Sequence, residues 1–314
     1  AQLASLLSLT FQPLEELTEE LGLTKKEGRE LVKSMSAKGL IYLNRTSRGI
    51  EVLMLPFIVG FYENQRDRMD ETLARLFEDY YAEAAFGLLS VEPQFQRVIP
   101  VNETITPGIE ILPEESVSEL LSNKKAWAVV DCICRKQQSM LGQGCEHPMK
   151  VCLVMSDMPD VFTAQPGMEI LDLEGALGIL DQAAKAGLVH TISNQKKDIS
   201  YVCNCCTCSC GLLRGISEAH IANVVARSAY YAFVDDDLCT GCGNCEDLCQ
   251  FDAITLSIMA EINPDICVGC GVCAKSCPTQ AIFLLRRDEA DVLVIPDSTS
   301  DWLEQRAAAR KLTQ

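Results

Sequence analysis

The chain has 314 residues, of which 48% are hydrophobic and 23% charged, so it can build cores for two or three domains. Its net charge of −17 disfavours binding to nucleic acid backbones. No uninterrupted apolar run, Val292 to Pro296 included, approaches the length that crosses a bilayer, so the chain is expected to be soluble and not to span a membrane.

Cysteine is the most unusual component, with 17 residues in the chain. Such a density occurs in small secreted disulfide scaffolds and in proteins that bind metals. A chain with this length and this many core residues does not need disulfides to fold, and its Cys-x-x-Cys spacings favour metal binding. The sequence therefore predicts a metal protein of a reducing compartment, the cytoplasm.

Two amphipathic helices are expected near the start of the chain. Apolar residues at helical spacing predict the first helix, and Thr24 is expected to cap the second. The second helix is expected to turn Leu31, Val32 and Met35 inward. Two short strands, 40–44 and 50–55, follow it and are joined by a polar turn.

This order of helix, turn, helix and two-stranded wing resembles a winged-helix domain over residues 1–60. The resemblance implies either DNA binding or protein docking. Lys25, Lys26 and Arg29 on the second helix favour DNA, but glutamates dilute them and the acidic chain favours docking. Residues 61–125 are expected to form a helical linker region.

Residues 126–232 indicate a small, cysteine-rich α/β domain. One buried strand is expected to end in Cys132 and Cys134, a second carries Cys152, and a third runs into a dense group of cysteines. The three strands are expected to converge on one edge, where residues far apart in sequence can meet. The candidate metal ligands of this region are Cys132, Cys134, Cys145, Cys152, Cys203, Cys205, Cys206, Cys208 and Cys210.

The dense group is "YVCNCCTCSCG", residues 201–211. It contains two interlocking Cys-x-x-Cys pairs, Cys203 with Cys206 and Cys205 with Cys208, so alternate cysteines are expected to face two centres. Nine thiols would serve two 4Fe-4S clusters and leave one over. Three interpretations stay open: one or two further 4Fe-4S clusters, a structural zinc ion, or a thiol redox site.

The C-terminal part repeats one cysteine pattern. The segments "CTGCGNCEDLC" and "CVGCGVCAKSC" both read C-x₂-C-x₂-C-x₃-C, and their flanking residues also match, so the region is an internal repeat. The spacing is typical of two-cluster iron–sulfur proteins. The pattern resembles the bacterial-type two-[4Fe-4S] ferredoxin domain over residues 233–286, which implies a ferredoxin-like fold with pseudo-twofold symmetry.

The resemblance implies crossed cluster ligands, because the fourth cysteine of each repeat binds the other cluster. One [4Fe-4S] cluster is expected on Cys239, Cys242, Cys245 and Cys277, and the other on Cys267, Cys270, Cys273 and Cys249. One departure from the family pattern is present. Pro278 follows the last cysteine of the second repeat as usual, but Gln250 stands at that position in the first.

The whole chain is therefore expected to be an α+β protein with a helical tail over 287–314, capped near Ser300. The predicted function is electron transfer. The chain would relay single electrons between a low-potential donor, a ferredoxin or flavoprotein, and the catalytic subunit of an anaerobic oxidoreductase complex. No nicotinamide-binding or phosphate-binding glycine motif is present, so the chain itself is expected to be non-catalytic.

Two alternative functions stay open. The first is a catalytic reductase subunit that uses a middle cluster with an open iron site. The second is an iron–sulfur redox sensor that binds DNA through the winged helix, although nucleic acid is not the expected partner of so acidic a chain.

Overall fold

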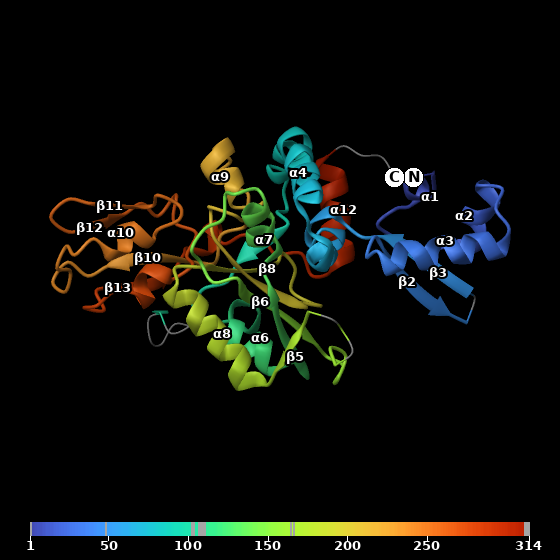
Figure 1. Ribbon diagram of the computed structural model, residues 1–314. Coiled ribbons are helices and arrows are strands. Elements are labelled where there is room, and N and C mark those ends of the chain that lie inside the picture. Colours follow the sequence, from blue (N-terminus) through green and yellow to red (C-terminus); the bar gives the residue numbers. More distant parts are fainter. Residues whose placement is uncertain are drawn as a thin grey trace. The chain divides into compact units, whose positions relative to one another are not determined.

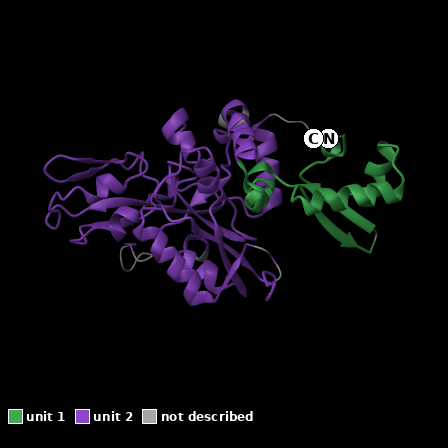
Figure 2. Cartoon of the chain, in the orientation of Figure 1, with its two compact units in different colours: residues 1–70 green, residues 71–314 purple. Residues whose placement is uncertain are grey.

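The computed structural model describes residues 2–47, 49–101, 104–105, 111–163, 165 and 167–310, without the side chains of 84–86, 88 and 113. The chain divides into two compact units, residues 1–70 (unit 1) and 71–314 (unit 2) (Figure 2). The regions expected as separate middle and ferredoxin domains, 126–232 and 233–286, thus lie within one compact unit.

Unit 1 combines helices with a three-stranded antiparallel sheet whose strand order is β1-β3-β2. A capping box of Thr24 and Glu27 starts the long helix, as an N-cap threonine predicts. In chain order the elements are α1 (Gln2–Leu6), β1 (Gln12–Pro13), α2 (Leu14–Glu20), α3 (Lys25–Ala37), β2 (Ile41–Thr46) and β3 (Gly49–Met54), followed by a 3₁₀ helix (Glu63–Arg68).

The core of unit 1 lies between the helices and the sheet. Val32 is 1% exposed and Met35 packs on the same core, whereas Leu31 is 37% exposed, so its expected inward position is wrong. The helical period carries Leu31 to the rim of the buried face. The order of elements fits a winged helix, and that assignment stays a prediction.

A six-stranded antiparallel sheet forms the centre of unit 2, with strand order β4-β8-β9-β6-β5-β7 (Figure 1). Helices α6 and α8 pack against it around Leu153, Ile192 and Val202, which are at most 1% exposed. The strands are β4 (Gln96–Val98), β5 (Ala126–Asp131), β6 (Lys150–Ser156), β7 (Glu169–Leu171), β8 (Val189–Ser193) and β9 (Tyr201–Cys205).

Helices connect and flank these strands. Cys134 lies on one of them, α7, and not at the end of a strand as expected, because the chain enters a helix directly after Cys132. The helices are α4 (Glu71–Tyr80), which continues through Tyr81–Ala85 into α5 (Phe86–Leu89), then α6 (Val117–Ser122), α7 (Ile133–Met140), α8 (Leu173–Lys185) and α9 (Arg214–Ala219).

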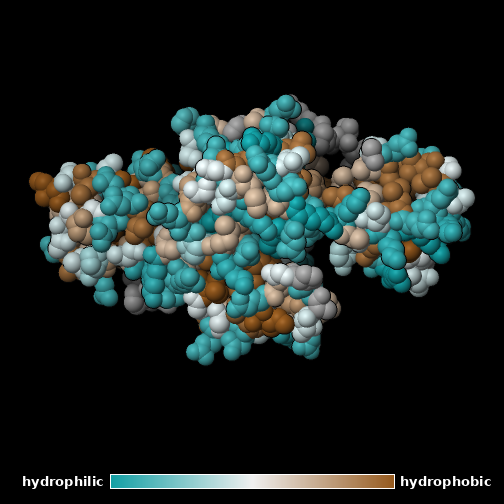
Figure 3. Space-filling model, viewed as in Figure 1, coloured by the Kyte–Doolittle hydropathy of each residue, from teal (hydrophilic) through white to brown (hydrophobic). Residues whose placement is uncertain are grey.

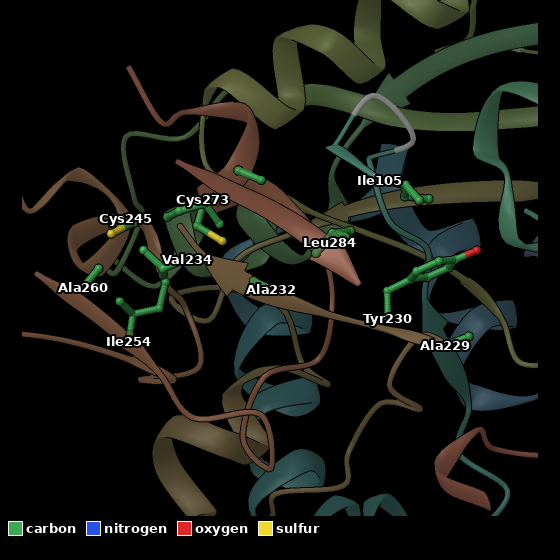
Figure 4. Packing of buried hydrophobic residues seen from close by; sticks show 12 residues of the cluster. Ile105, Ala229, Tyr230, Ala232, Val234, Cys245, Ile254, Ala260, Cys273 and Leu284 are labelled. Atoms are coloured by element: carbon green, nitrogen blue, oxygen red, sulfur yellow. The ribbon is translucent and has the colours of Figure 1, made fainter. Parts of the chain in front are cut away.

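The repeated cysteine segment forms two antiparallel strand pairs, β10 with β13 and β11 with β12, each half contributing one short helix. Its core contains Tyr230 and Leu284, both 0% exposed, and the thiols of Cys245 and Cys273 join the same core (Figure 4). The elements are β10 (Tyr230–Val234), α10 (Asn244–Leu248), β11 (Ile254–Leu256), β12 (Ala260–Ile262), α11 (Val272–Lys275) and β13 (Ile282–Arg286).

The tail forms helix α12 (Thr299–Ala309), and its N-cap is Ser298, close to the expected position near Ser300. Trp302 Nε1 donates to the carbonyl oxygen of Gln94 at 2.8 Å, and Arg306 Nη1 donates to that of Pro93 at 2.6 Å. The tail therefore belongs to unit 2. Its last four residues, 311–314, lie outside the described part of the chain. Within the described ranges, no helix has both the length and the apolar character of a membrane span.

Candidate metal centres

Two cavities in the repeated segment are each lined by four cysteines. One is lined by Cys239, Cys242, Cys245 and Cys277. The other is lined by Cys249, Cys267, Cys270 and Cys273. In both cavities three thiols come from one loop and the fourth from the other repeat, so the structure brings the thiols together in the crossed grouping that the resemblance implied.

The loops of these cavities require glycine. Gly241 and Gly269 have positive φ angles of 62° and 70°, a conformation that L side chains rarely adopt. A Cβ atom at Gly269 would overlap the carbonyl oxygen of Tyr230, and one at Gly241 would overlap that of Ile258. Near the fourth cysteine a backbone amide also points at sulfur, since the N–H of Ala281 donates to Cys277 Sγ at 3.3 Å.

The pKa values of thiols in the two cavities are consistent with binding to cations. Burial raises the pKa of Cys270 to about 12, so this thiol would ionise at neutral pH only beside a cation such as cluster iron. Burial also opposes ionisation of Cys277, but hydrogen bonds from the Thr279 hydroxyl and the Ala281 amide outweigh it and lower the pKa of Cys277. Both cavities can therefore accept a group that binds thiolates.

The two loops differ in exposure, although their sequences repeat. Thr240, Cys242 and Asn244 of the first loop are exposed, whereas Val268 and Val272, at matching positions of the second, are buried. The second loop is covered by neighbouring parts of unit 2, because the backbone of Val268 and of Cys270 accepts hydrogen bonds from residues outside the repeat. One cavity therefore faces solvent and the other faces the interior of unit 2.

The cysteines of the middle region gather at one end of three adjacent strands. Strand β5 ends where β6 begins, since Val130 is paired with Cys152, and β9 runs antiparallel beside β6. Cys203 and Cys205 lie on the last residues of β9, opposite Thr191 and Val189 of β8. The expected convergence of three strands is thus present in the sheet.

Six of the nine middle thiols are linked as neighbours in a closed ring, called here the six-thiol ring. The Cys132 thiol contacts those of Cys134 and Cys152, and the Cys205 thiol contacts those of Cys203 and Cys210. Two further contacts, Cys134 with Cys210 and Cys152 with Cys203, close the ring. Its members come from the junction of β5 and α7, from α7 itself, from β6, from β9 and from the segment after β9.

The other three thiols form a compact group, called here the three-thiol site. The Sγ atoms of Cys145, Cys206 and Cys208 all lie within 4.8 Å of one another, which makes this group a possible metal site. The Cys145 and Cys206 sulfurs are 4.0 Å apart, and Ser209 Oγ lies 3.3 Å from Cys145 Sγ. Cys206 is buried and Cys208 is exposed.

This division differs from the expected pairing of Cys203 with Cys206 and Cys205 with Cys208. Residues two apart on a strand share a face, so Cys203 and Cys205 turn to the same side and into the same ring. Cys206 follows the strand and turns to the other side. The described middle region thus brings its thiols together as a ring of six and a group of three.

Polar residues that the sequence analysis did not select also contact these thiols. Arg135, 1% exposed, donates to Cys206 Sγ at 3.3 Å. Thr191 Oγ1 lies 3.4 Å from Cys205 Sγ, and Gln96 Nε2 donates to Cys203 Sγ at 3.7 Å. Arg135 directly follows Cys134, a signal available in the sequence. Gln96 and Thr191 carry no such signal, because they reach the ring through strand pairing alone.

Gln250, the residue that replaces the usual proline, connects the two parts of the site. Its Oε1 accepts from the backbone N–H of Thr207 at 2.6 Å. Its Nε2 donates to the carbonyl oxygens of Gly187 and of Cys205, the latter at 3.4 Å. Proline could make neither contact. The departure from the family pattern therefore ties the residue after Cys249 to the backbone of the segment that carries the middle cysteines.

Glu78 on α4 holds together the elements that carry the middle thiols. Its carboxylate accepts hydrogen bonds from the side chains of Gln137 at 2.9 Å and Gln138 at 3.1 Å on α7. It also forms an ion pair with Arg214, the first residue of α9, which begins shortly after Cys210. Burial opposes ionisation of Glu78, but the hydrogen bonds and charge of Arg214 outweigh it, so the pKa of Glu78 lies below its usual 4.5.

We expect Glu78→Gln to lower the free energy of unfolding by about 1–3 kcal/mol at pH 7, because a charge-assisted contact to nearly buried Arg214 is lost. A carboxylate with a depressed pKa stabilises the fold above its unfolded pKa and loses this effect as pH falls through the folded pKa. The gap between wild type and variant should therefore stay constant from pH 7 to 5 and shrink at pH 4. Denaturant unfolding measures it, with exposed Glu83→Gln as the control; an equal loss in that control would contradict the prediction.

Comparison with known families identifies the repeated segment. Residues 232–255 and 260–283 each match the 4Fe-4S binding domain family. These matches confirm a two-cluster ferredoxin segment and support two 4Fe-4S clusters and an iron–sulfur electron-transfer role. Among curated proteins, none matches the chain.

Proposed function

We propose that the protein is an electron-transfer subunit that accepts electrons from a redox partner at its exposed cysteine loop and delivers them towards the middle cysteines. When bound, 4Fe-4S clusters accept and donate single electrons. The observation that carries the proposal is the contrast between the two loops, one of them exposed at Cys242 and one buried at Val268 and Val272. A partner can approach the first loop and not the second.

The surface beside the exposed loop suits a protein partner. Leu238 is 49% exposed and Ile258 87% exposed, and the acidic residues Asp236 and Asp247 stand nearby in sequence. Apolar patches among hydrophilic residues are visible at the end of unit 2 that carries β11 and β12 (Figure 3). Such a mixture of apolar and charged residues favours transient docking.

Gln250 connects the buried ferredoxin cavity to the middle region, where the proposed electron path ends. Its two-sided contact with Thr207 and Cys205 fixes the second cavity beside the middle thiols. The ion pair of Lys275 with Asp181 on α8, at 3.2 Å, supports the same junction. Short, fixed contacts between redox sites are what a relay requires. We assign unit 1 to docking on an oxidoreductase complex in the cytoplasm.

The proposal is tested by the rate at which the methyl viologen radical cation reduces the protein. Asp236→Lys with Asp247→Lys should slow reduction several-fold at low salt, because the acidic loop attracts this cationic donor, and the difference should fade at high salt. Glu304→Lys, an exposed charge on α12, is the matched control and should leave the rate unchanged. If the reduction rate fell equally in the double variant and in the control, or in neither of them, electrons would enter the protein elsewhere.

A further inference from the structure

The size of the three-thiol site is that of a single metal ion. Tetrahedral thiolates about 2.3 Å from one zinc ion lie about 3.8 Å apart. The Cys145 and Cys206 sulfurs are 4.0 Å apart, and Cys208 lies within 4.8 Å of both. Among the described residues no other three histidine, cysteine or acidic side chains come this close, including those of the two ferredoxin cavities. The site is therefore more compact than the cluster cavities.

The fourth position of the three-thiol site is open. Within the described part of the chain, no fourth histidine, cysteine or carboxylate joins the group. Ser209 Oγ approaches Cys145 Sγ at 3.3 Å, where it can act as a hydrogen-bond partner, and Cys208 is exposed. Three protein ligands with one open position are the arrangement of metal sites that bind an exchangeable ligand, whereas structural zinc sites use four.

The six-thiol ring is suited to several metal ions. One tetrahedral ion takes four thiolates, yet all six thiols are joined into one ring through their neighbours. No three of them lie within 4.8 Å of one another, so the ring is less compact than the three-thiol site. Three of the six thiols, those of Cys132, Cys205 and Cys210, are buried. Thiolates at these positions need cationic compensation beyond Arg135, and bound metal ions supply it.

We propose that the middle region holds two metal centres of different nuclearity. The six-thiol ring binds a polynuclear iron–sulfur centre, and the three-thiol site binds one zinc ion whose fourth position accepts an exogenous nitrogen or sulfur ligand. The redox role of the ring rests on the proposed function, because Gln250 brings the inner ferredoxin cavity to the carbonyl oxygen of Cys205, a ring member. The division of thiols between two centres does not depend on it.

The test is metal and sulfide content of air-free protein, compared between two variants. Wild type should contain about one zinc ion and iron beyond the roughly eight atoms of two 4Fe-4S clusters. Cys208→Ser should lose the zinc and keep all the iron. Cys152→Ser should lose the additional iron and keep the zinc. Cys242→Ser, in the exposed ferredoxin cavity, is the control that should change neither middle centre.

Loss of the same metal in Cys208→Ser and Cys152→Ser would overturn the division, and so would wild-type protein without metal beyond eight iron atoms. X-ray absorption at the zinc edge of wild type, prepared without added thiols, tests the smaller site without any variant: three sulfurs and one lighter atom are expected, and four sulfurs would contradict it. Cobalt in place of zinc should change its visible absorption when imidazole is added. If the proposed electron-transfer function were wrong, this would appear in the rates at which the ferredoxin clusters are reduced, and not in the metal content.

Discussion

Cys249→Ser is expected to remove the cluster of the buried cavity and to spare that of the exposed one, although Cys249 belongs by sequence to the repeat that forms the exposed loop. The reason is geometric, since Cys249 lines the cavity of Cys267, Cys270 and Cys273. Iron should fall by about four atoms, the content of one cubane. Iron analysis with electron paramagnetic resonance of the reduced protein measures the loss.

The mirror variant supplies the control. Cys277→Ser should remove the exposed cluster, because Cys277 lines the cavity of Cys239, Cys242 and Cys245. The two variants should therefore retain different signals, and only Cys249→Ser should keep rapid reduction by an external donor. If Cys249→Ser and Cys239→Ser gave the same remaining signal, the cysteines of each repeat would serve their own cluster and the crossed assignment would be lost.

The ferredoxin segment was predictable because its ligands are local. Three cysteines within seven residues, with glycines between them, are the local pattern of a loop that wraps a cubane cluster. The exposure of this loop could also be predicted from its local sequence. Thr240 and Asn244 stand where the second repeat has Val268 and Val272, and this exchange of polar for apolar residues distinguishes the outer from the inner cavity.

The middle region was less predictable because strand pairing decides which thiols meet. The local spacing of "CNCCTC" suggested pairs of the Cys-x-x-Cys type, yet β9 turns Cys203 and Cys205 to one side and leaves Cys206 for the other. Cys152 and Cys132 join the ring only through the pairing of β5, β6 and β9. Gln250 stood out as a departure from the family pattern, but its contact with Thr207 depends on the packing of the two regions.

Arg135→Met is expected to be the most destabilising single change near the middle thiols. The side chain is 1% exposed and donates to the carbonyl oxygens of Pro148 and Asn204 at 3.1 and 2.9 Å, as well as to Cys206 Sγ. Methionine fills similar volume without a donor, so these acceptors lose their partner. We expect a loss of about 3–5 kcal/mol in the free energy of unfolding, measured by denaturant titration under anaerobic conditions.

A second buried arginine separates the general effect of burial from the effect of the thiols. Arg97, 3% exposed, donates to the carbonyl oxygen of Glu114 at 2.7 Å, and burial lowers its pKa to about 10. Burial opposes the charge of Arg135 too, but the thiols of Cys132 and Cys206 outweigh it and raise the pKa of Arg135. Arg97→Met should therefore destabilise the fold and leave the metal content unchanged, whereas Arg135→Met should also release metal from the middle region. If both variants kept their metal, Arg135 would serve the packing of α7 and not the charge of the bound centre.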